Sequence, residues 1–274
     1  MDWLTAAQQL RRDGLPGVLV TVLDVRGHAP RDPGTKMVVG AAGTWGSVGG
    51  GNLEQSAIHR ARQLIAAGAS GSEILETRLT ERSGNAHGRQ CCGGVVRLLL
   101  EPLPAWPTVA VFGVGHVGYE LARILGRLPV RLQLVDSRAE QLDRVRLAEV
   151  FDGVAEVTVH HAVLGEQVLE QLPPGAHVLI MTHDHAEDFA LCDMALRLPR
   201  LGSIGLIGSA AKWARFRREL TGSGHPPAVI DRIDCPIGLP GITGKDPAII
   251  AISVAAALTK QFTARQVGAA RELT

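Results

Sequence analysis

The most informative pattern of apolar and polar positions lies near the middle of the chain. Residues 109–112 are all apolar, as expected for a strand covered on both faces of a parallel sheet. A glycine turn, Gly113-x-Gly115-x-x-Gly118, follows, and apolar residues then recur at helical spacing as far as residue 125. This pattern predicts a strand, a tight turn and a helix whose N-terminus could hold a phosphate.

A second apolar strand is predicted over residues 131–136, and it ends in an acid. Asp136 lies 23 residues after Gly113, where a carboxylate in a Rossmann unit reaches a ribose hydroxyl. Arg138 could neutralise a 2′-phosphate or simply face solvent. We therefore predict a Rossmann-type unit. Whether it holds a dinucleotide is a separate question, because the glycines could serve only to pack helix on strand.

Strands and helices alternate through the rest of the chain. Further strands are predicted over residues 175–182 and 203–208, and helices over 139–148 (with Leu142, Val145 and Leu147 inward), 210–220 and 247–262. This alternation predicts an α/β fold with a doubly wound parallel sheet. Ligands of such sheets bind at the carboxyl ends of the strands. The residues expected on that rim are 113–118, Asp136, His183, His185, Gly208 and Ser209.

The first hundred residues have a different pattern. Strands are predicted over residues 18–25, 36–39, 74–79 and 95–100, and helices over 3–12 and 53–67. Residues 101–107 contain three prolines and are interpreted as a stiff linker. We therefore expect a smaller α+β N-terminal domain, residues 1–105, followed by a Rossmann-like C-terminal domain, residues 106–274.

Composition narrows the class of protein. Lys and Arg number 28 against 27 for Asp and Glu, so net charge gives no case for a nucleic-acid or membrane partner. Aromatic residues make up only 4%, which disfavours base-stacking surfaces. The longest uncharged apolar run, residues 247–259, is too short to span a bilayer, and the first residues lack the layout of a signal peptide. We expect a cytoplasmic protein.

Two adjacent cysteines, Cys91 and Cys92, are the most unusual feature of the N-terminal part. They lie between a polar loop with Arg89 and two glycines, and a nearby cation favours the thiolate that binds metals. Alternatively, they are small buried apolar residues at the start of a strand. Cys192 and Cys235 are weaker candidates, and no cysteine spacing indicates a structural zinc site.

Other segments could meet an anion or move a proton. The triple glycine Gly49, Gly50 and Gly51 leads into a helix and could present free amides, or be a flexible turn. His183 and His185 could bind metal together, transfer protons or contact a nucleotide. Ser209 before the basic helix, and Lys245 after Gly244, could bind phosphate, although basic residues usually just face water.

Six motifs occur in order along the chain: Gly49-Gly-Gly-Asn-Leu-Glu54, Gln90-Cys-Cys-Gly-Gly94, Val111-Phe-Gly-Val-Gly-His-Val-Gly118, Met181-Thr-His-Asp-His185, Gly205-Leu-Ile-Gly-Ser209, and Pro236-Ile-Gly-Leu239 followed by Thr243-Gly-Lys-x-Pro247. Together they resemble the XdhC/CoxI family of xanthine dehydrogenase accessory proteins, over nearly the whole chain. The resemblance implies a chaperone, not an enzyme, that binds and protects the molybdenum cofactor, assists its sulfuration and promotes its insertion into a molybdenum hydroxylase of purine catabolism.

The resemblance also implies partners: xanthine dehydrogenase, a cysteine desulfurase and the proteins of molybdenum cofactor synthesis. Homodimers are common for such folds, but the sequence leaves the oligomeric state open. The residues expected to contact the cofactor are Cys91, Cys92, Gly49, Gly50, Gly51, Gly113, Gly115, Gly118, Asp136, His183, His185, Ser209 and Lys245, with Cys91 and Cys92 on the metal.

Two other functions stay open on the sequence alone. One is an NAD(P)-dependent oxidoreductase, in which the glycine turn binds the nicotinamide nucleotide and His183 or His185 acts as acid or base. The other is a nucleotide-sensing module like those that gate ion transport, for which the two cysteines would be idle. The cofactor chaperone is favoured because it uses both the paired thiols and the nucleotide-type fold.

Overall fold

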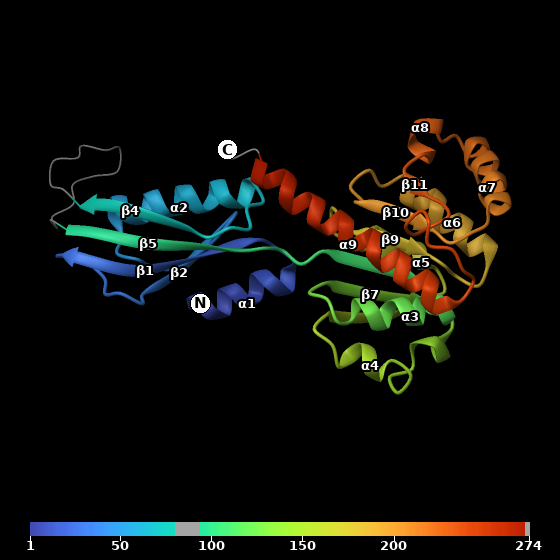
Figure 1. Cartoon of the computed structure of the whole chain (residues 1–274), viewed down its shortest axis with the longest axis horizontal. Coiled ribbons are helices and arrows are strands. Elements are labelled where there is room, and N and C mark those ends of the chain that lie inside the picture. Colours follow the sequence, from blue (N-terminus) through green and yellow to red (C-terminus); the bar gives the residue numbers. More distant parts are fainter. Residues whose placement is uncertain (80–93, 272–274) are drawn as a thin grey trace. The chain divides into compact units, whose positions relative to one another are not determined.

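The computed structural model describes residues 1–79 and 94–271, with side chains described as far as residue 262. The chain forms two compact units. One comprises Met1–Trp106 together with Thr263–Thr274, and the other comprises Pro107–Phe262. Figure 1 shows the elements of both units in chain order.

The first unit contains a five-stranded antiparallel sheet with the order β3-β2-β1-β5-β4. Alternate side chains along β1 leave on opposite faces, as the strand period of two requires. Val18 and Val20 pack under α2, whereas Leu19 packs with α1. The elements are α1 (Trp3–Asp13), β1 (Gly17–Gly27), β2 (Lys36–Gly40), β3 (Thr44–Gly46), α2 (Gly51–Ala66), β4 (Glu73–Leu79) and β5 (Gly94–Leu103).

The predicted linker begins too early in the sequence. β5 continues as far as Leu103, and Pro102 lies opposite Val18 of β1. β4 pairs with β5 only up to Leu100, so β5 has a neighbour on one side alone where the proline lies. A proline lacks the N–H donor, and a strand position with a single neighbour tolerates that loss.

The second unit contains a six-stranded sheet with the order β11-β10-β9-β6-β7-β8, and every pair in it is parallel. This is the strand order of a Rossmann fold, so the predicted doubly wound α/β architecture is confirmed. The strands are β6 (Thr108–Phe112), β7 (Arg131–Asp136), β8 (Glu156–His161), β9 (His177–Ile180), β10 (Ser203–Leu206) and β11 (Ile233–Asp234).

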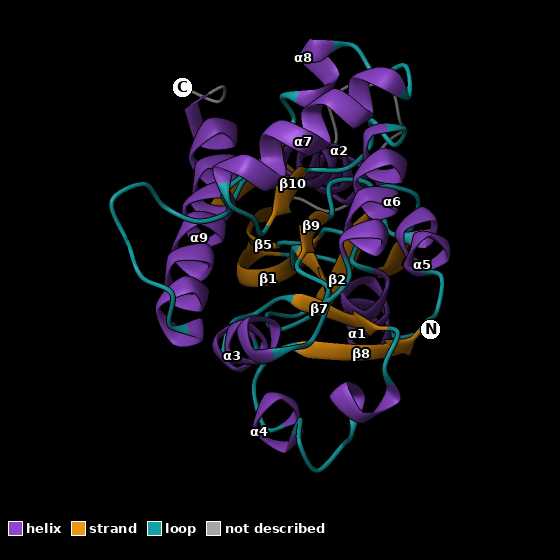
Figure 2. Ribbon diagram, turned by 90° about the vertical axis from the view of Figure 1, so that its right-hand side faces the viewer, coloured by secondary structure: helices purple, strands orange, loops and turns teal. Residues whose placement is uncertain are grey.

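Helices cover both faces of this sheet. Figure 2 shows α3 and α9 on one side and α5 and α6 on the other, and two separate apolar cores lie between helices and sheet. The helices are α3 (His116–Leu125), the 3₁₀ helix η1 (Ala139–Leu142), α4 (Ala148–Phe151), α5 (Gly165–Gln171), α6 (His185–Leu196), α7 (Ala210–Gly222), α8 (Pro227–Ile230) and α9 (Pro247–Arg271).

The helix predicted over residues 139–148 is wrong. The chain forms η1 there and begins α4 only at Ala148, and Val145, expected to face inward, is 85% exposed. Asp143 explains the break, because its carboxylate accepts hydrogen bonds from the amides of Val145 and Arg146 and so forms a turn. The sequence pattern does not predict β8 or α5. β8 is an edge strand and only partly buried, so its apolar pattern is weak.

Candidate functional site

The candidate site lies at the carboxyl ends of β6 and β9, where the direction of the strand order reverses. From β6 the chain proceeds outward to β7 and β8, and it then returns to place β9 on the other side of β6. Open α/β sheets bind ligands at this reversal point. Of the predicted rim residues, Asp136 is the last residue of β7, and residues 113–118, His183 and Ser209 follow the carboxyl ends of β6, β9 and β10.

The three glycines of the turn have different roles. Gly113 has φ +97°, and a Cβ built on it would lie 2.3 Å from the Met181 carbonyl oxygen. A Cβ on Gly118 would lie 2.0 Å from the carbonyl oxygen of Gly113, so these two glycines are required by packing. A Cβ on Gly115 would meet only Nη2 of Arg138, at 3.9 Å. Packing does not explain Gly115, and the space above it is open.

Gly115 is the N-cap of α3, and no side chain among the described residues caps this helix. The amides of a first helical turn have no partner within the helix, and together with the helix dipole they favour an anion. The open space over Gly115 therefore has the position and the charge preference of an anion site.

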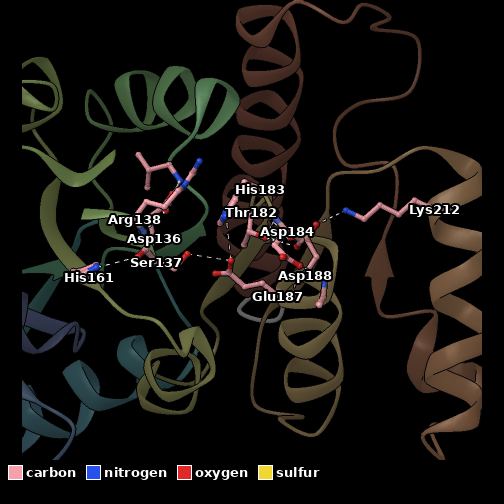
Figure 3. Close-up of polar contacts among 12 residues, drawn as sticks. Asp136, Ser137, Arg138, His161, Thr182, His183, Asp184, Glu187, Asp188 and Lys212 are labelled. Atoms are coloured by element: carbon pink, nitrogen blue, oxygen red, sulfur yellow. Dashed lines mark hydrogen bonds and ion pairs between the residues drawn. The ribbon is translucent and has the colours of Figure 1, made fainter. Parts of the chain in front are cut away.

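Arg138 lies beside this opening, with Nη2 3.9 Å from a Cβ built on Gly115. Figure 3 shows the Asp136 carboxylate in contact with this arginine. Asp136 is 3% exposed as a residue, and its carboxylate accepts four hydrogen bonds. The donors are the Arg138 amide (2.9 Å), Arg138 Nε and Nη2 (3.0 Å each) and the Val114 amide (2.7 Å). Burial on its own would raise the pKa of Asp136, but these hydrogen bonds outweigh it and hold the pKa below the ordinary value. A ribose hydroxyl would have to compete with these donors for the carboxylate.

His183, His185 and Glu187 follow the carboxyl end of β9. His183 Nδ1 lies 3.9 Å from Glu187 Oε2, and Ser137 Oγ lies 3.5 Å from the same oxygen. Burial, together with the charges of Asp136 and Asp188, raises the pKa of Glu187. His185 is exposed as the first residue of α6. The two histidines are thus at the predicted edge, and His183 lies beside the partly buried carboxyl of Glu187.

A buried ion pair that the sequence prediction missed supports this edge. Asp188 on α6 is fully buried, and Lys212 on α7 donates to its Oδ2 and to the carbonyl oxygen of Ile207. The other carboxylate oxygen of Asp188 accepts from the amide (3.0 Å) and the hydroxyl (2.8 Å) of Thr182. The pair therefore fixes the residues that follow β9 and β10.

The signal for this pair was available in the sequence. Lys212 is four and eight residues before Phe216 and Leu220, which are the buried residues of α7. Asp188 is four residues before the buried Cys192 on α6. Both charged residues therefore lie on the buried face of their helices. Helical spacing applied to the charged residues of α7 distinguishes Lys212 from the arginines that face solvent.

Ser209 and Lys245 each lie at the start of a helix. The Ser209 hydroxyl caps α7 by accepting from the Lys212 amide at 3.2 Å. Lys245 is exposed and precedes Asp246, whose carboxylate accepts from the Ala248 amide at the start of α9. The chain's own side chains thus cap both helix starts.

Amides at the triple glycine of the first unit also have hydrogen-bond acceptors within the chain. Gly49, Gly50 and Gly51 all have positive φ, as a sharp turn into α2 requires. Oε2 of Glu54 accepts from the amides of Val48 (3.2 Å) and Gly50 (3.1 Å), and the Gly49 amide donates to Ser47 Oγ at 3.2 Å. The predicted cofactor contact at these glycines would therefore have to compete with a carboxylate already in place.

The cysteines divide into two groups. Cys91 and Cys92, the predicted metal ligands, lie outside the described residues. Burial raises the pKa of the Cys192 thiol, and burial likewise raises the pKa of Cys235 to about 11. Within residues 1–79 and 94–262, no group of three or more His, Cys, Asp or Glu side chains is arranged to hold a metal ion.

Comparison with known proteins extends these observations. A profile of the XdhC Rossmann domain matches residues 109–258, and a profile of the XdhC and CoxI family matches residues 10–77. Across the described residues, no helix combines the length and apolar character needed to cross a bilayer.

Two similar proteins give the extent of the relationship. An uncharacterised protein of Escherichia coli K12, YqeB, is 27% identical over 258 residues. The match covers 93% of this chain and 45% of YqeB, so the chain spans about half the length of this curated relative. A solved structure from Bacillus halodurans, titled as a xanthine dehydrogenase, is 19% identical and covers 97% of each chain, with a TM-score of 0.47. The family profiles, which span most of both units, show that the chain belongs to the XdhC and CoxI family.

Proposed function

We propose that this chain binds the molybdenum cofactor and acts as an accessory protein for xanthine dehydrogenase or a related molybdenum hydroxylase. In this proposal it protects the cofactor, assists its sulfuration and promotes its insertion into the client enzyme. Membership of the XdhC and CoxI family supports the accessory role in general terms. The observation that carries cofactor binding is the open space over Gly115, with the guanidinium of Arg138 beside it.

The residues at the turn suit the anionic end of the cofactor. Molybdopterin carries a phosphate, and the uncapped first turn of α3 offers amides to an anion. Arg138 adds a fixed positive charge, because Asp136 already binds two of its guanidinium nitrogens and so restricts its rotamers. The phosphate would lie on the Gly115 side of this guanidinium.

The metal end of the cofactor requires softer ligands. When bound, the cofactor supplies a molybdenum ion that accepts thiolate and sulfido ligands. We propose that Cys91 or Cys92 holds or shields that ion. A protein that passes its ligand on should use several modest contacts instead of one closed cage, and an open turn with a single arginine satisfies that requirement.

The geometry favours the cofactor over a nicotinamide nucleotide. An NAD-binding Rossmann unit needs the acid after its second strand to accept from the ribose. In this chain Asp136 is buried, and its carboxylate already accepts four hydrogen bonds. The proposed partners are the client hydroxylase, a cysteine desulfurase and the cofactor synthesis proteins, and we place the protein in the cytoplasm.

A retention assay tests the proposal. Purified protein is mixed with molybdenum cofactor, small molecules are removed, and molybdenum and pterin in the protein fraction are quantified. Wild type should retain both. Gly115→Val should lose pterin and molybdenum together while staying folded, and the Cys91→Ala/Cys92→Ala double variant should lose mainly molybdenum.

The same assay with NAD(P)H in place of the cofactor decides between the two ligand classes. Retention of the nicotinamide nucleotide and not of the cofactor would overturn the proposal. Gly222→Ala is the matched control, because a Cβ at Gly222 meets nothing within 4 Å and this residue lies at the far end of α7.

A further inference from the structure

A cavity of about 750 Å³ lies beyond the carboxyl end of β10, inside the second unit. Its walls come from the end of β10, from the loop between β11 and α9, and from the first turns of α9. The lining residues are Ile207, Gly208, Ser209, Pro236, Ile237, Gly238, Leu239, Pro240, Gly241, Ile242, Thr243, Gly244, Ile249, Ile250 and Ser253. This volume is that of a small-molecule site.

The lining indicates what kind of group the cavity accepts. It contains aliphatic side chains, glycines and three hydroxyls, and none of its residues is charged. Among the described residues, no acceptor pairs with the backbone N–H groups of Gly241, Thr243 and Gly244. An uncharged planar heterocycle matches these walls, because its faces contact aliphatic groups and its ring carbonyl and nitrogens accept from amides.

The loop wall is fixed in place before any ligand arrives. The Leu239 amide donates to Ser253 Oγ at 2.8 Å, which ties the loop to α9. Gly238 has φ +113°, and a Cβ there would lie 2.5 Å from the same hydroxyl oxygen. A wall held in this way loses little conformational entropy on binding.

The cavity also lies in line with the glycine turn. Gly113, Met181 and Ile207 are the first residues after β6, β9 and β10. Each amide donates to a carbonyl oxygen of the neighbouring strand, and the acceptors are Val135, Phe112 and Ile180, respectively. Two strand spacings separate Gly113 from Ile207, or about 10 Å. α3, α9 and the cavity residues Ile237 and Ile250 all pack on the same face of the sheet, the face shown with α3 and α9 in Figure 2.

We propose that this cavity holds the uncharged ring system of a phosphorylated heterocycle whose phosphate lies over Gly115. The ends of β6, β9 and β10 set the distance between the phosphate position and the ring position. Arg138 lies at the phosphate end, where the ligand would be negative, and the cavity at the other end is lined by uncharged residues that suit a neutral ring. That the ring is the pterin of the molybdenum cofactor rests on the proposed function. The class of ligand, an anion joined to a neutral ring, rests on the space over Gly115 beside Arg138 and on the uncharged cavity.

The test fills the cavity from α9. Ile249 lines the cavity and is 40% exposed, whereas Ile252, one turn later on the same helix, is 55% exposed and does not line it. Ile249→Trp is compared with Ile252→Trp, and Ile242→Trp fills the cavity from the loop side. The probes are 6-hydroxymethylpterin phosphate, followed by its own fluorescence, AMP, and inorganic pyrophosphate as a ring-free anion.

We expect Ile249→Trp and Ile242→Trp each to weaken pterin phosphate binding about tenfold or more, because an indole would occupy the space of the ring. Ile252→Trp should change it by less than about twofold, and pyrophosphate affinity should stay the same in all three variants. Gly115→Val should weaken the binding of all three probes, because each carries a phosphate group. Circular dichroism confirms that each variant is folded.

The outcomes separate the two proposals. If pterin phosphate binds both cavity-filling variants as it binds wild type, or if wild type binds no phosphorylated heterocycle, the inference is overturned. If AMP binds in an Ile249-dependent manner while the molybdenum cofactor is not retained, the cavity is supported and the proposed function falls.

Discussion

Arg138 and Asp136 are joined by two parallel hydrogen bonds, Nε to Oδ1 and Nη2 to Oδ2, each 3.0 Å long. The acid that a Rossmann sequence pattern assigns to a ribose therefore holds an arginine beside the glycine turn. The side chain of Asp136 is 2% exposed and that of Arg138 is 28% exposed, so the carboxylate is buried and the guanidinium side chain is partly accessible to solvent. The ion pair thereby holds the Arg138 guanidinium beside the open space over Gly115.

The pair should make stability depend on pH in the acid range. The pKa of Asp136 is lowered in the folded protein, so its contribution to stability is complete above the ordinary aspartate pKa of about 4 and is lost as the pH falls further. Asp136→Asn should lower the free energy of unfolding at pH 7 by about 2 kcal/mol, less than the roughly 3–5 kcal/mol of fully buried pairs. Urea unfolding at a series of pH values measures the difference in free energy of unfolding between wild type and Asp136→Asn.

The difference between wild type and Asp136→Asn should narrow as the pH falls from about 5 to 2. Asp152→Asn is the control for the loss of one negative charge, because Asp152 is exposed in the same unit. A difference that stays constant over this range would show that Asp136 does not act through its charge.

The three turn glycines should respond to alanine in different ways. Gly113→Ala and Gly118→Ala each should destabilise the protein by about 2 kcal/mol or more, because the new methyl groups would overlap backbone atoms. Gly115→Ala should change stability by less than about 0.5 kcal/mol, since its Cβ would meet only Arg138. Chemical unfolding of the three variants measures this order, and equal effects at Gly115 and Gly118 would contradict the assignment of Gly115 to a ligand.

How far the sequence predicts this molecule depends on the type of pattern. The apolar run at residues 109–112 and the spacing of Gly113, Gly115 and Gly118 define β6 and α3, because burial on both faces and a tight turn leave few other residue choices. β8 and α5 had no such pattern. The edge strand is half-buried, so its apolar alternation is weak.

The site was predictable in position but not in detail. That Asp136 and His183 lie at the same edge of the sheet follows from topology, since both lie at the carboxyl ends of parallel strands. That the Asp136 carboxylate accepts from Arg138, and that Glu54 occupies the amides near Gly50, depends on side-chain rotamers. Helical or strand periodicity carries no information on those rotamers, so the contacts emerge only from the structure.

Glu54 should stabilise the start of α2. Its Oε2 accepts from Ser47 Oγ at 2.5 Å and from the amides of Val48 and Gly50. Glu54→Ala would leave these donors without that acceptor and should cost about 1–2 kcal/mol, with faster hydrogen exchange at the two amides. Glu54→Gln, which keeps one oxygen acceptor, should cost less. Gln55→Ala, at an exposed neighbouring position, is the control, and an equal loss there would show a general effect on the helix.

The buried pair of Asp188 and Lys212 should be the most sensitive ionic contact of the second unit. Their side chains are 1% and 10% exposed, so removing one partner leaves a charge without compensation in the interior. Lys212→Met alone should destabilise the protein by about 3–5 kcal/mol, whereas the Asp188→Leu/Lys212→Met double variant should be less destabilised than the sum of the single changes.

A double-mutant cycle by chemical unfolding measures the coupling between Asp188 and Lys212 directly. The exposed pair of Arg217 and Asp231 on the same unit, with side chains 41% and 59% exposed, provides the comparison. Arg217→Met should cost less than about 1 kcal/mol, because solvent screens that pair. If Lys212→Met cost no more than Arg217→Met, the pair would not fix the ends of β9 and β10. The placement of Ile207 in the wall of the cavity would then have to depend on apolar packing alone.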